Sequence, residues 1–144
     1  MNPLLTKVPL FAGLDAAELQ QLVAILDERQ IAPGELIIQQ YTTGDEIYII
    51  EQGTVEIFVE GLQEGKTLVL LGQGQVVGEL ALIDHGYRSA SARATSREGC
   101  KLLVLRGSEF MALCERQHHI GFVVMRNLAV DVAFKLRHRN LADM

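Results

Sequence analysis

One short segment carries residue types that can bind an anion. Residues 76–83 are apolar apart from Gly78 and Glu79, and a tight turn then leads to Arg88 and Ser89. Glycine lets a backbone approach a ligand closely, and the free N–H groups of a helical turn after it attract an anion. A guanidinium fork and a hydroxyl suit a phosphate group. The spacing therefore predicts a small anion site.

Glu79 adds a second kind of chemistry to this segment. A carboxylate beside an anion site needs a hydrogen-bond donor, and a sugar hydroxyl is such a donor. A phosphate and a sugar hydroxyl held together in an apolar cup describe a nucleotide. Taken alone, a Gly-Glu pair is commonly a surface turn and an arginine is commonly exposed. The nucleotide hypothesis therefore depends on their combination in one segment.

Short strands separated by glycine turns must position these residues. The pattern predicts a mainly β fold with flanking helices, a jelly-roll-like β-barrel or sandwich of the double-stranded β-helix type, rather than βαβ units. A hairpin loop is expected at residues 61–65. The expected strands are 36–38, 47–50, 55–59, 67–71, 90–95 and 101–105.

Helical patterns flank the strands on both sides. Asp15 and Glu18 have the spacing of a capping box at the start of an N-terminal helix. Ser108 is the expected N-cap of a short helix that ends near Cys114, and a longer helix is expected from about 119 to 139. The N-terminal helix is expected to bury an apolar stripe of Leu19, Leu22, Val23 and Leu26.

The long C-terminal helix is apolar over more than one face. One face can pack on the barrel, and the surplus favours a homodimer through the same helix of a second subunit. The alternative is a helix packed wholly within its own domain. The first face comprises Ile120, Val124, Leu128, Val132 and Leu136, and the surplus comprises Val123, Val130 and Phe134.

Composition sets the broad class. The 144 residues suit one domain, expected as a helical lead-in (1–28), a β-barrel (29–106) and C-terminal helices (107–140). A net charge of −5 disfavours direct nucleic-acid binding, and no apolar run predicts membrane insertion. The two cysteines form no CxxC pair, which favours reduced thiols and a cytoplasmic protein. The four histidines form no HxH pattern, so neither a metal site nor a cupin-like metalloenzyme is expected.

The segment at 78–83, followed after four residues by Arg88, Ser89 and Ala90, resembles the phosphate-binding cassette of the cyclic-nucleotide-binding domain family. That family includes regulatory subunits of the cyclic-AMP-dependent kinase, cyclic-nucleotide-gated channels and the bacterial catabolite activator protein. The resemblance extends over the whole chain, to the lead-in at 9–11, the turns at 33–35 and 53–55, and Asp45 with Tyr48.

The resemblance implies a role for each cassette residue. Glu79 would accept the ribose 2′-hydroxyl, Arg88 would pair with the cyclic phosphate, and Ser89 would donate to a phosphate oxygen. Backbone N–H groups of Gly78, Glu79, Leu80 and Ala81 would face the ribose and phosphate, and Ala90 would complete the ligand-binding set.

The same resemblance bears on the base and on two departures from the family pattern. Serine directly after the cassette arginine favours cyclic AMP, and cyclic GMP stays open as the alternative. The C-terminal helix would cover the base, and its possible base contacts are Phe134, Lys135 and Arg137. Tyr41 stands where the family often has glycine, and Val77 where it often has phenylalanine.

The implied function is a non-enzymatic regulatory sensor that signals through movement of its C-terminal helix. It needs no cofactor or catalytic residue, and its effector is unknown. One alternative is a ligand-free scaffold or dimerisation module of the same fold. Another is a transcription factor, but no helix-turn-helix follows the long helix here. The output then comes from a separate partner, or this chain is part of a longer protein, and both possibilities stay open.

Overall fold

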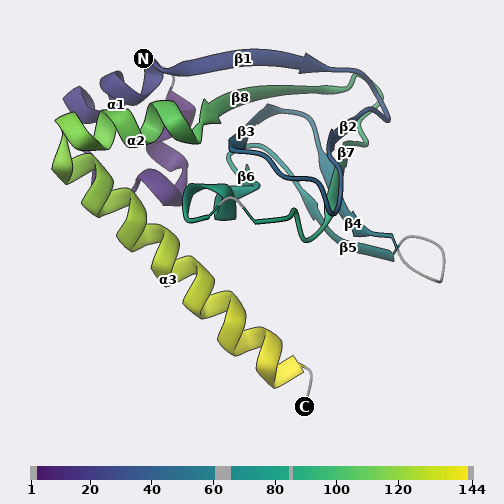
Figure 1. Cartoon of the computed structure of the whole chain (residues 1–144). Coiled ribbons are helices and arrows are strands. Elements are labelled where there is room, and N and C mark those ends of the chain that lie inside the picture. Colours follow the sequence, from purple (N-terminus) through teal and green to yellow (C-terminus); the bar gives the residue numbers. More distant parts are fainter. Residues whose placement is uncertain (1–2, 61–65, 85, 143–144) are drawn as a thin grey trace.

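A computed structural model describes residues 3–60, 66–84 and 86–142. Two four-stranded antiparallel sheets form a sandwich, in the orders β1-β8-β3-β6 and β2-β7-β4-β5 (Figure 1). The predicted mainly β fold with flanking helices is therefore confirmed, as a sandwich rather than a closed barrel. The strands are β1 (Leu26–Ile31), β2 (Leu36–Ile38), β3 (Glu46–Gln52), β4 (Val55–Val59), β5 (Lys66–Leu71), β6 (Val76–Val77), β7 (Ser91–Ala94) and β8 (Cys100–Arg106).

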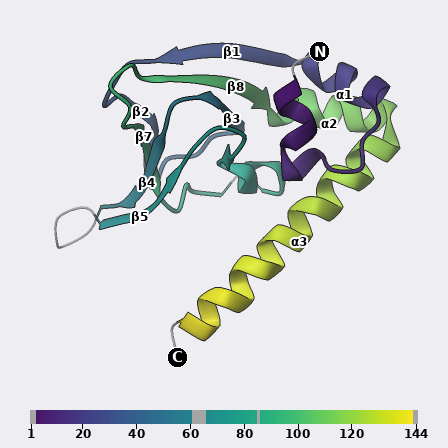
Figure 2. The same ribbon diagram turned by 180° about the vertical axis from the view of Figure 1, so that it is seen from behind.

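Short 3-10 turns and three α-helices complete the described chain. They are η1 (Pro3–Lys7), η2 (Pro9–Phe11), α1 (Ala16–Val23), η3 (Glu79–Leu82), α2 (Gly107–Arg116) and α3 (His118–Ala142). The N-terminal turns lie beside the first part of α3, and the rest of α3 extends away as a long rod (Figure 2). The expected hairpin loop at 61–65 lies outside the described residues.

Strand β3 separates two apolar cores. Ile47 and Ile49 belong to the core that the helices cover, whereas Tyr48 and Ile50 belong to the core between the two sheets. Successive side chains of a strand point to opposite faces, so a strand buried on both sides is apolar at every position. The neighbouring β8 behaves in the same way. The first sheet therefore lies between the helices and the second sheet.

The N-terminal helix begins as predicted but ends early. Its capping box is present, because Asp15 Oδ1 accepts the Glu18 N–H at 2.8 Å and Glu18 Oε1 accepts the Asp15 N–H at 3.1 Å. Leu26, predicted as the last residue of the helical stripe, instead begins β1 and pairs with Leu105 of β8. The prediction was wrong at this residue because helical and strand spacing coincide over so short a stretch.

The start of α2 is capped from a distant loop. Ser108, predicted as the N-cap, lies inside the helix, and the N-cap position is Arg106 with no side-chain cap. Asp45 does the capping: its carboxylate accepts the Ser108 N–H at 3.2 Å, and its carbonyl accepts the Gly107 N–H at 2.7 Å. A carboxylate is favourable at a helix N-terminus, so this contact stabilises α2.

The two halves of α3 differ in burial. Ile120, Val124 and Leu128 are fully buried against the helical core, whereas Leu136, from the same predicted stripe, is exposed. Of the predicted surplus, Val130 and Phe134 are exposed, whereas Val123 is half-buried. The large apolar residues exposed on α3 are Phe122 near its start and Val130, Phe134 and Leu136 further along. Within the described residues, no helix is long and apolar enough to cross a membrane.

Candidate functional site

Gly78 turns the chain from β6 into the single helical turn η3. Its φ of 81° lies in the left-handed region, which glycine occupies without strain. A Cβ atom here would lie 2.7 Å from Arg88 Nη1 and 3.1 Å from Ile38 Cδ1. The helical turn that the sequence predicts is present as η3, with Gly78 at its N-cap. The first N–H groups of this turn have no acceptor within the turn itself.

Arg88 is held at the side of this turn by neutral groups. Its Nη2 donates to the Glu46 carbonyl at 2.8 Å, and its Nη1 donates to the Gly78 carbonyl at 3.3 Å. Backbone hydrogen bonds with Tyr41 and Thr42 fix its main chain. Among the residues that the structure describes, no carboxylate lies within ion-pair distance of Arg88. Its positive charge is therefore available to an anion in the cavity.

Glu46 fixes the carbonyl that holds Arg88, and the sequence patterns did not single it out. Its carboxylate accepts two hydrogen bonds from Arg29, at 3.1 and 3.0 Å, and one from the Tyr48 hydroxyl at 2.8 Å. The Arg29 hydrogen bonds lower the pKa of Glu46, against the opposing effect of burial. Burial, with the nearby Glu46, raises the pKa of Tyr48 to about 12. Glu46 therefore stays ionised and Tyr48 stays neutral near neutral pH.

Glu79 is mostly buried and meets the C-terminal helix. Its side chain is 19% exposed, and its Oε1 accepts from Lys135 Nζ at 3.1 Å. Lys135 also contacts Asp131 Oδ2 at 2.9 Å, one helical turn earlier. Burial lowers the pKa of Lys135, but its contacts with Asp131 and Glu79 outweigh that effect and raise it overall. The lysine therefore remains charged between two carboxylates.

Gly78, Glu79, Arg88 and Lys135 line one cavity of about 760 Å³. Apolar side chains of the second sheet, including Ile57, Val69 and Leu71, form part of its wall. Of the predicted site residues, the structure brings together Gly78, Glu79, Leu80, Ala81, Arg88, Ser89, Ala90 and Lys135.

Two of the three possible base contacts lie elsewhere. Neither Phe134 nor Arg137 lines the cavity; Phe134 stacks on His138 with their ring centroids 3.8 Å apart, and Arg137 is exposed. The sequence patterns missed Asn127 and Asp131, which line the cavity from α3. Asn127, Asp131 and Lys135 follow one another at steps of four residues, which places all three on one helical face.

Asn127 ties α3 to the N-terminal lead-in. Its side-chain amide donates to the carbonyls of Leu10 and Ala12, at 2.9 and 2.8 Å. Both acceptors are at η2, more than 100 residues earlier in the chain. The helix that borders the cavity is therefore fixed at its middle to backbone rather than to side chains alone.

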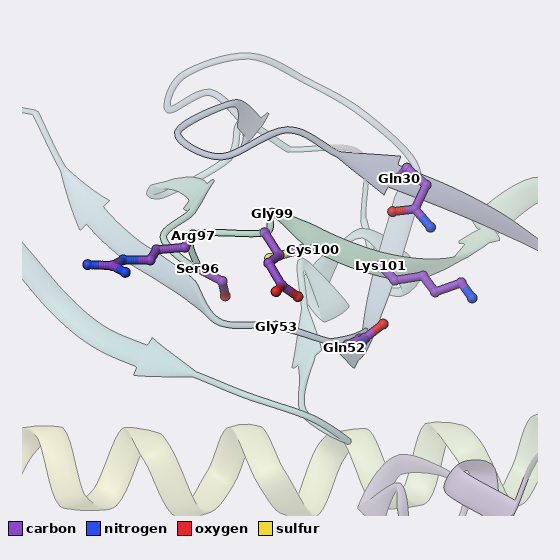
Figure 3. Close-up of a pocket in the computed structure, with 9 residues that line it drawn as sticks. Gln30, Gln52, Gly53, Ser96, Arg97, Gly99, Cys100 and Lys101 are labelled. Carbon is purple, nitrogen blue, oxygen red and sulfur yellow. The ribbon is translucent and has the colours of Figure 1, made fainter.

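A second cavity, of about 460 Å³, lies at the other end of β3, where the β3–β4 and β7–β8 turns meet (Figure 3). The side chains of Arg97 and Lys101 extend away from each other in this view, and Lys101 pairs with Glu28 at 2.7 Å. Its lining residues are Gln30, Gln52, Gly53, Ser96, Arg97, Glu98, Gly99, Cys100 and Lys101. It shares no residue with the first cavity.

The candidate metal-ligating and thiol side chains lie apart from one another. Within residues 3–60, 66–84 and 86–142, no three His, Cys, Asp or Glu side chains gather as a metal site. Cys100 and Cys114 are free, and burial raises the pKa of both thiols. A raised pKa keeps a thiol protonated and unreactive, which agrees with the predicted role as packed thiols.

Comparison with known proteins identifies a family model and relatives that match this chain. The family model of the cyclic nucleotide-binding domain matches residues 28–117. The Cyclic AMP receptor protein of Thermus thermophilus is 36% identical over 134 residues, which make up 92% of this chain and 59% of that protein.

Solved structures agree with the sequence comparison. The crystal structure of Thermus thermophilus Catabolite Activator Protein has a TM-score of 0.82 at 36% identity, over 93% of this chain and 61% of that one. The regulatory domain of Toxoplasma gondii PKA, crystallised with cAMP, has a TM-score of 0.70 at 27% identity, over 76% of this chain and 41% of that one.

The antiparallel sandwich, with its helical turn and arginine in one cavity, is a jelly-roll binding domain. The chain belongs to the cyclic nucleotide-binding domain family. It spans 59% of the length of the Thermus receptor protein and 61% of the Thermus activator chain.

Proposed function

We propose that this chain is a non-enzymatic sensor domain that binds cyclic AMP in the cavity beside Gly78. The observation that carries the proposal is the setting of Arg88, a charged guanidinium on the cavity wall whose hydrogen bonds go to carbonyls rather than to a carboxylate. Such a charge attracts an anionic ligand and gains strong hydrogen bonds from a phosphate.

The other cassette residues have matching roles in this proposal. The N–H groups at the start of η3 face the cyclic phosphate and ribose, Glu79 accepts the 2′-hydroxyl, and Ser89 donates to a phosphate oxygen. Leu80, Ala81 and Ala90 form the apolar surroundings of the ligand. All of them line the same cavity.

Cyclic AMP is the preferred ligand for two reasons. Ser89 follows Arg88 directly, a pattern that favours cyclic AMP, and two of the similar proteins carry cyclic AMP in their name or as a bound ligand. Cyclic GMP is the alternative, because a serine hydroxyl can also reach a guanine amino group. Phe134 and Arg137 become base contacts only after a rearrangement of α3, whereas Lys135 already borders the cavity.

The proposed signal is a movement of α3. Ligand in the cavity favours one position of the helix, and the difference in affinity between helix positions sets how far the equilibrium shifts. The exposed apolar residues of α3 favour pairing with the same helix of a second copy. Such a pair would carry the movement from one subunit to the next. We place the protein in the cytoplasm, where thiols stay reduced, and both of its cysteines are free.

The test is a calorimetric titration of the purified chain, stripped of bound nucleotide, with cyclic AMP and with cyclic GMP. We expect saturable binding of cyclic AMP that weakens by about 2 kcal/mol or more in Arg88→Ala, because a charge-assisted phosphate contact is lost. The matched control is Arg97→Ala, an exposed arginine at the second cavity, which should bind as the wild type does. Folded protein that binds neither nucleotide would favour the ligand-free scaffold instead.

A further inference from the structure

Glu79, the carboxylate proposed to bind the sugar hydroxyl, already accepts a hydrogen bond at one of its two oxygens. Glu79 Oε1 accepts from Lys135 at 3.1 Å, across 56 residues of sequence. Lys135 is held in turn by Asp131 Oδ2 at 2.9 Å. The three charges form a chain that runs from α3 to the first turn of the cassette. Within the described part of the chain, no hydrogen bond reaches Glu79 Oε2, which is therefore left for a second donor.

This chain of charges contributes little to stability. The Lys135 side chain is 61% exposed and that of Asp131 is 44% exposed, so water screens both interactions. Orientation is a different matter, because a hydrogen bond weakens steeply when donor and acceptor are misaligned. An ammonium on Oε1 restricts the rotation of the Glu79 carboxylate and fixes the direction of its other oxygen.

We propose that Lys135 is a positioning residue, which orients the Glu79 carboxylate toward the ligand's sugar hydroxyl, and that Asp131 holds Lys135 in place for this role. The inference rests on the proposed function, since it concerns the same cavity. It assigns Lys135 to the sugar side of the ligand, in place of the base contact that the sequence predicts. It also gives a role to Asp131.

The charges around the cavity support the same assignment. Three carboxylates line it, from Glu79, Asp84 and Asp131, against two cations, Arg88 and Lys135. An anionic ligand adds to the negative side. Lys135 reduces the negative potential of the two carboxylates that it contacts, Glu79 and Asp131. Glu79 can therefore accept a hydrogen bond from a sugar hydroxyl close to a phosphate site.

The first experiment measures discrimination between sugars. Cyclic AMP and its 2′-deoxy analogue are titrated into wild type, Lys135→Met, Lys135→Arg and Arg137→Met. We expect the wild type to prefer cyclic AMP by about tenfold or more, the size of a hydrogen bond to a charged group. Lys135→Met should reduce that preference by about three- to tenfold, and Lys135→Arg should restore most of it.

Arg137→Met is the matched control, because it removes one positive charge two residues away on the same helix. Arg137 does not line the cavity, so the Arg137→Met variant should prefer cyclic AMP over the 2′-deoxy analogue as strongly as the wild type does. An unchanged preference in Lys135→Met, with binding still lost in Arg88→Ala, would overturn the inference and leave the proposed function intact. Lys135→Met could instead change the ratio of the affinities for cyclic AMP and cyclic GMP and leave the preference between the two sugars unchanged. That result would assign Lys135 to the base and would also overturn the inference.

The second experiment needs no nucleotide. The pKa of the Lys135 ammonium is followed by NMR of its side-chain nitrogen in wild type, Glu79→Gln and Asp131→Asn. Because each carboxylate raises that pKa, we expect it to fall in both variants. A pKa that stays at the wild-type value in Glu79→Gln would show that the ion pair does not form, and would overturn the inference whatever the titrations give. Failure of the proposed function is recognised separately, as wild-type protein that binds neither nucleotide.

Discussion

The cavities at the two ends of β3 differ in how their polar groups are satisfied. At the cassette end, Arg88 and Glu79 keep charge directed at the cavity, beside apolar walls. At the other end, the turns bond to each other: Ser96 Oγ accepts the Thr54 N–H at 2.6 Å, and the Cys100 thiol donates to the Thr54 carbonyl at 3.0 Å. The second cavity also has charged residues, Arg97 and Glu98, but both are exposed to water. The difference teaches that a partly buried charge held beside apolar walls, rather than volume, distinguishes a ligand site from a crevice between turns.

Alanine substitution at Gly99 should show that the second cavity serves the fold. Gly99 has a φ of 78°, and a Cβ there would lie 2.0 Å from the Ile31 carbonyl, a backbone atom that cannot rotate away. We expect Gly99→Ala to destabilise the protein by about 3 kcal/mol or more in urea unfolding, or to prevent folding. Gly34→Ala is the control, with a φ of 79° and nothing within 4 Å, and should cost about 1 kcal/mol. Equal losses would contradict the comparison.

The equivalent change at the cassette should affect binding more than folding. A Cβ on Gly78 would meet the end of the Arg88 side chain at 2.7 Å, and a side chain can move where a carbonyl cannot. Displacing Arg88 should weaken cyclic AMP binding by about 2 kcal/mol, roughly 30-fold, measured by calorimetry. The loss of stability should stay near that of Gly34→Ala. If Gly78→Ala bound cyclic AMP with wild-type affinity, Arg88 would not be the residue that binds the phosphate.

Acid should weaken the support of Arg88, because part of that support is the ion pair of Glu46 with Arg29. The pKa of Glu46 is lowered by folding, so its stabilisation is present above the unfolded pKa and is lost as the pH falls through the folded value, below the ordinary 4.5. Glu46→Gln should cost about 1 kcal/mol at neutral pH, and the difference from wild type should vanish in acid. Urea unfolding across this pH range measures it. A difference that persists in acid would assign the effect to packing.

The smallest expected effect is a gain. Tyr41 has a φ of 71°, which costs a residue with a Cβ atom, and its side chain is 69% exposed. Tyr41→Gly should therefore stabilise the protein by about 0.5 kcal/mol, with little packing lost. Thermal unfolding measures the shift, with Tyr87→Gly, an exposed tyrosine elsewhere, as the control. A loss of stability would mean that the Tyr41 ring makes contacts that offset the strain.

Local patterns predicted the parts of the site that are local. The capping box of α1, most of the predicted strands and the helical turn after Gly78 follow from neighbours in sequence, and each is present. The glycine preference at Tyr41 also has its physical reason in the positive φ.

Contacts between distant residues could not be predicted in this way. The carbonyl of Glu46 that holds Arg88, and the lysine that holds Glu79, depend on which elements the fold brings together. The same limit explains Ser108, because the cap that replaced it comes from Asp45, 63 residues earlier. The residues around Ser108 do not indicate that a distant carboxylate will cap the helix.

The two hydrogen bonds from Asn127 to the lead-in make that residue a fulcrum. Lys135 lies eight residues further along the helix, about 12 Å away, and the end of α3 lies about 22 Å away, at 1.5 Å per residue. A tilt of about 10° about Asn127 would move Lys135 by about 2 Å and the helix end by about 4 Å. That first displacement suffices to break a hydrogen bond. In the proposed movement of α3, the far half of the helix would act as a lever arm, which enlarges a small adjustment at the cavity.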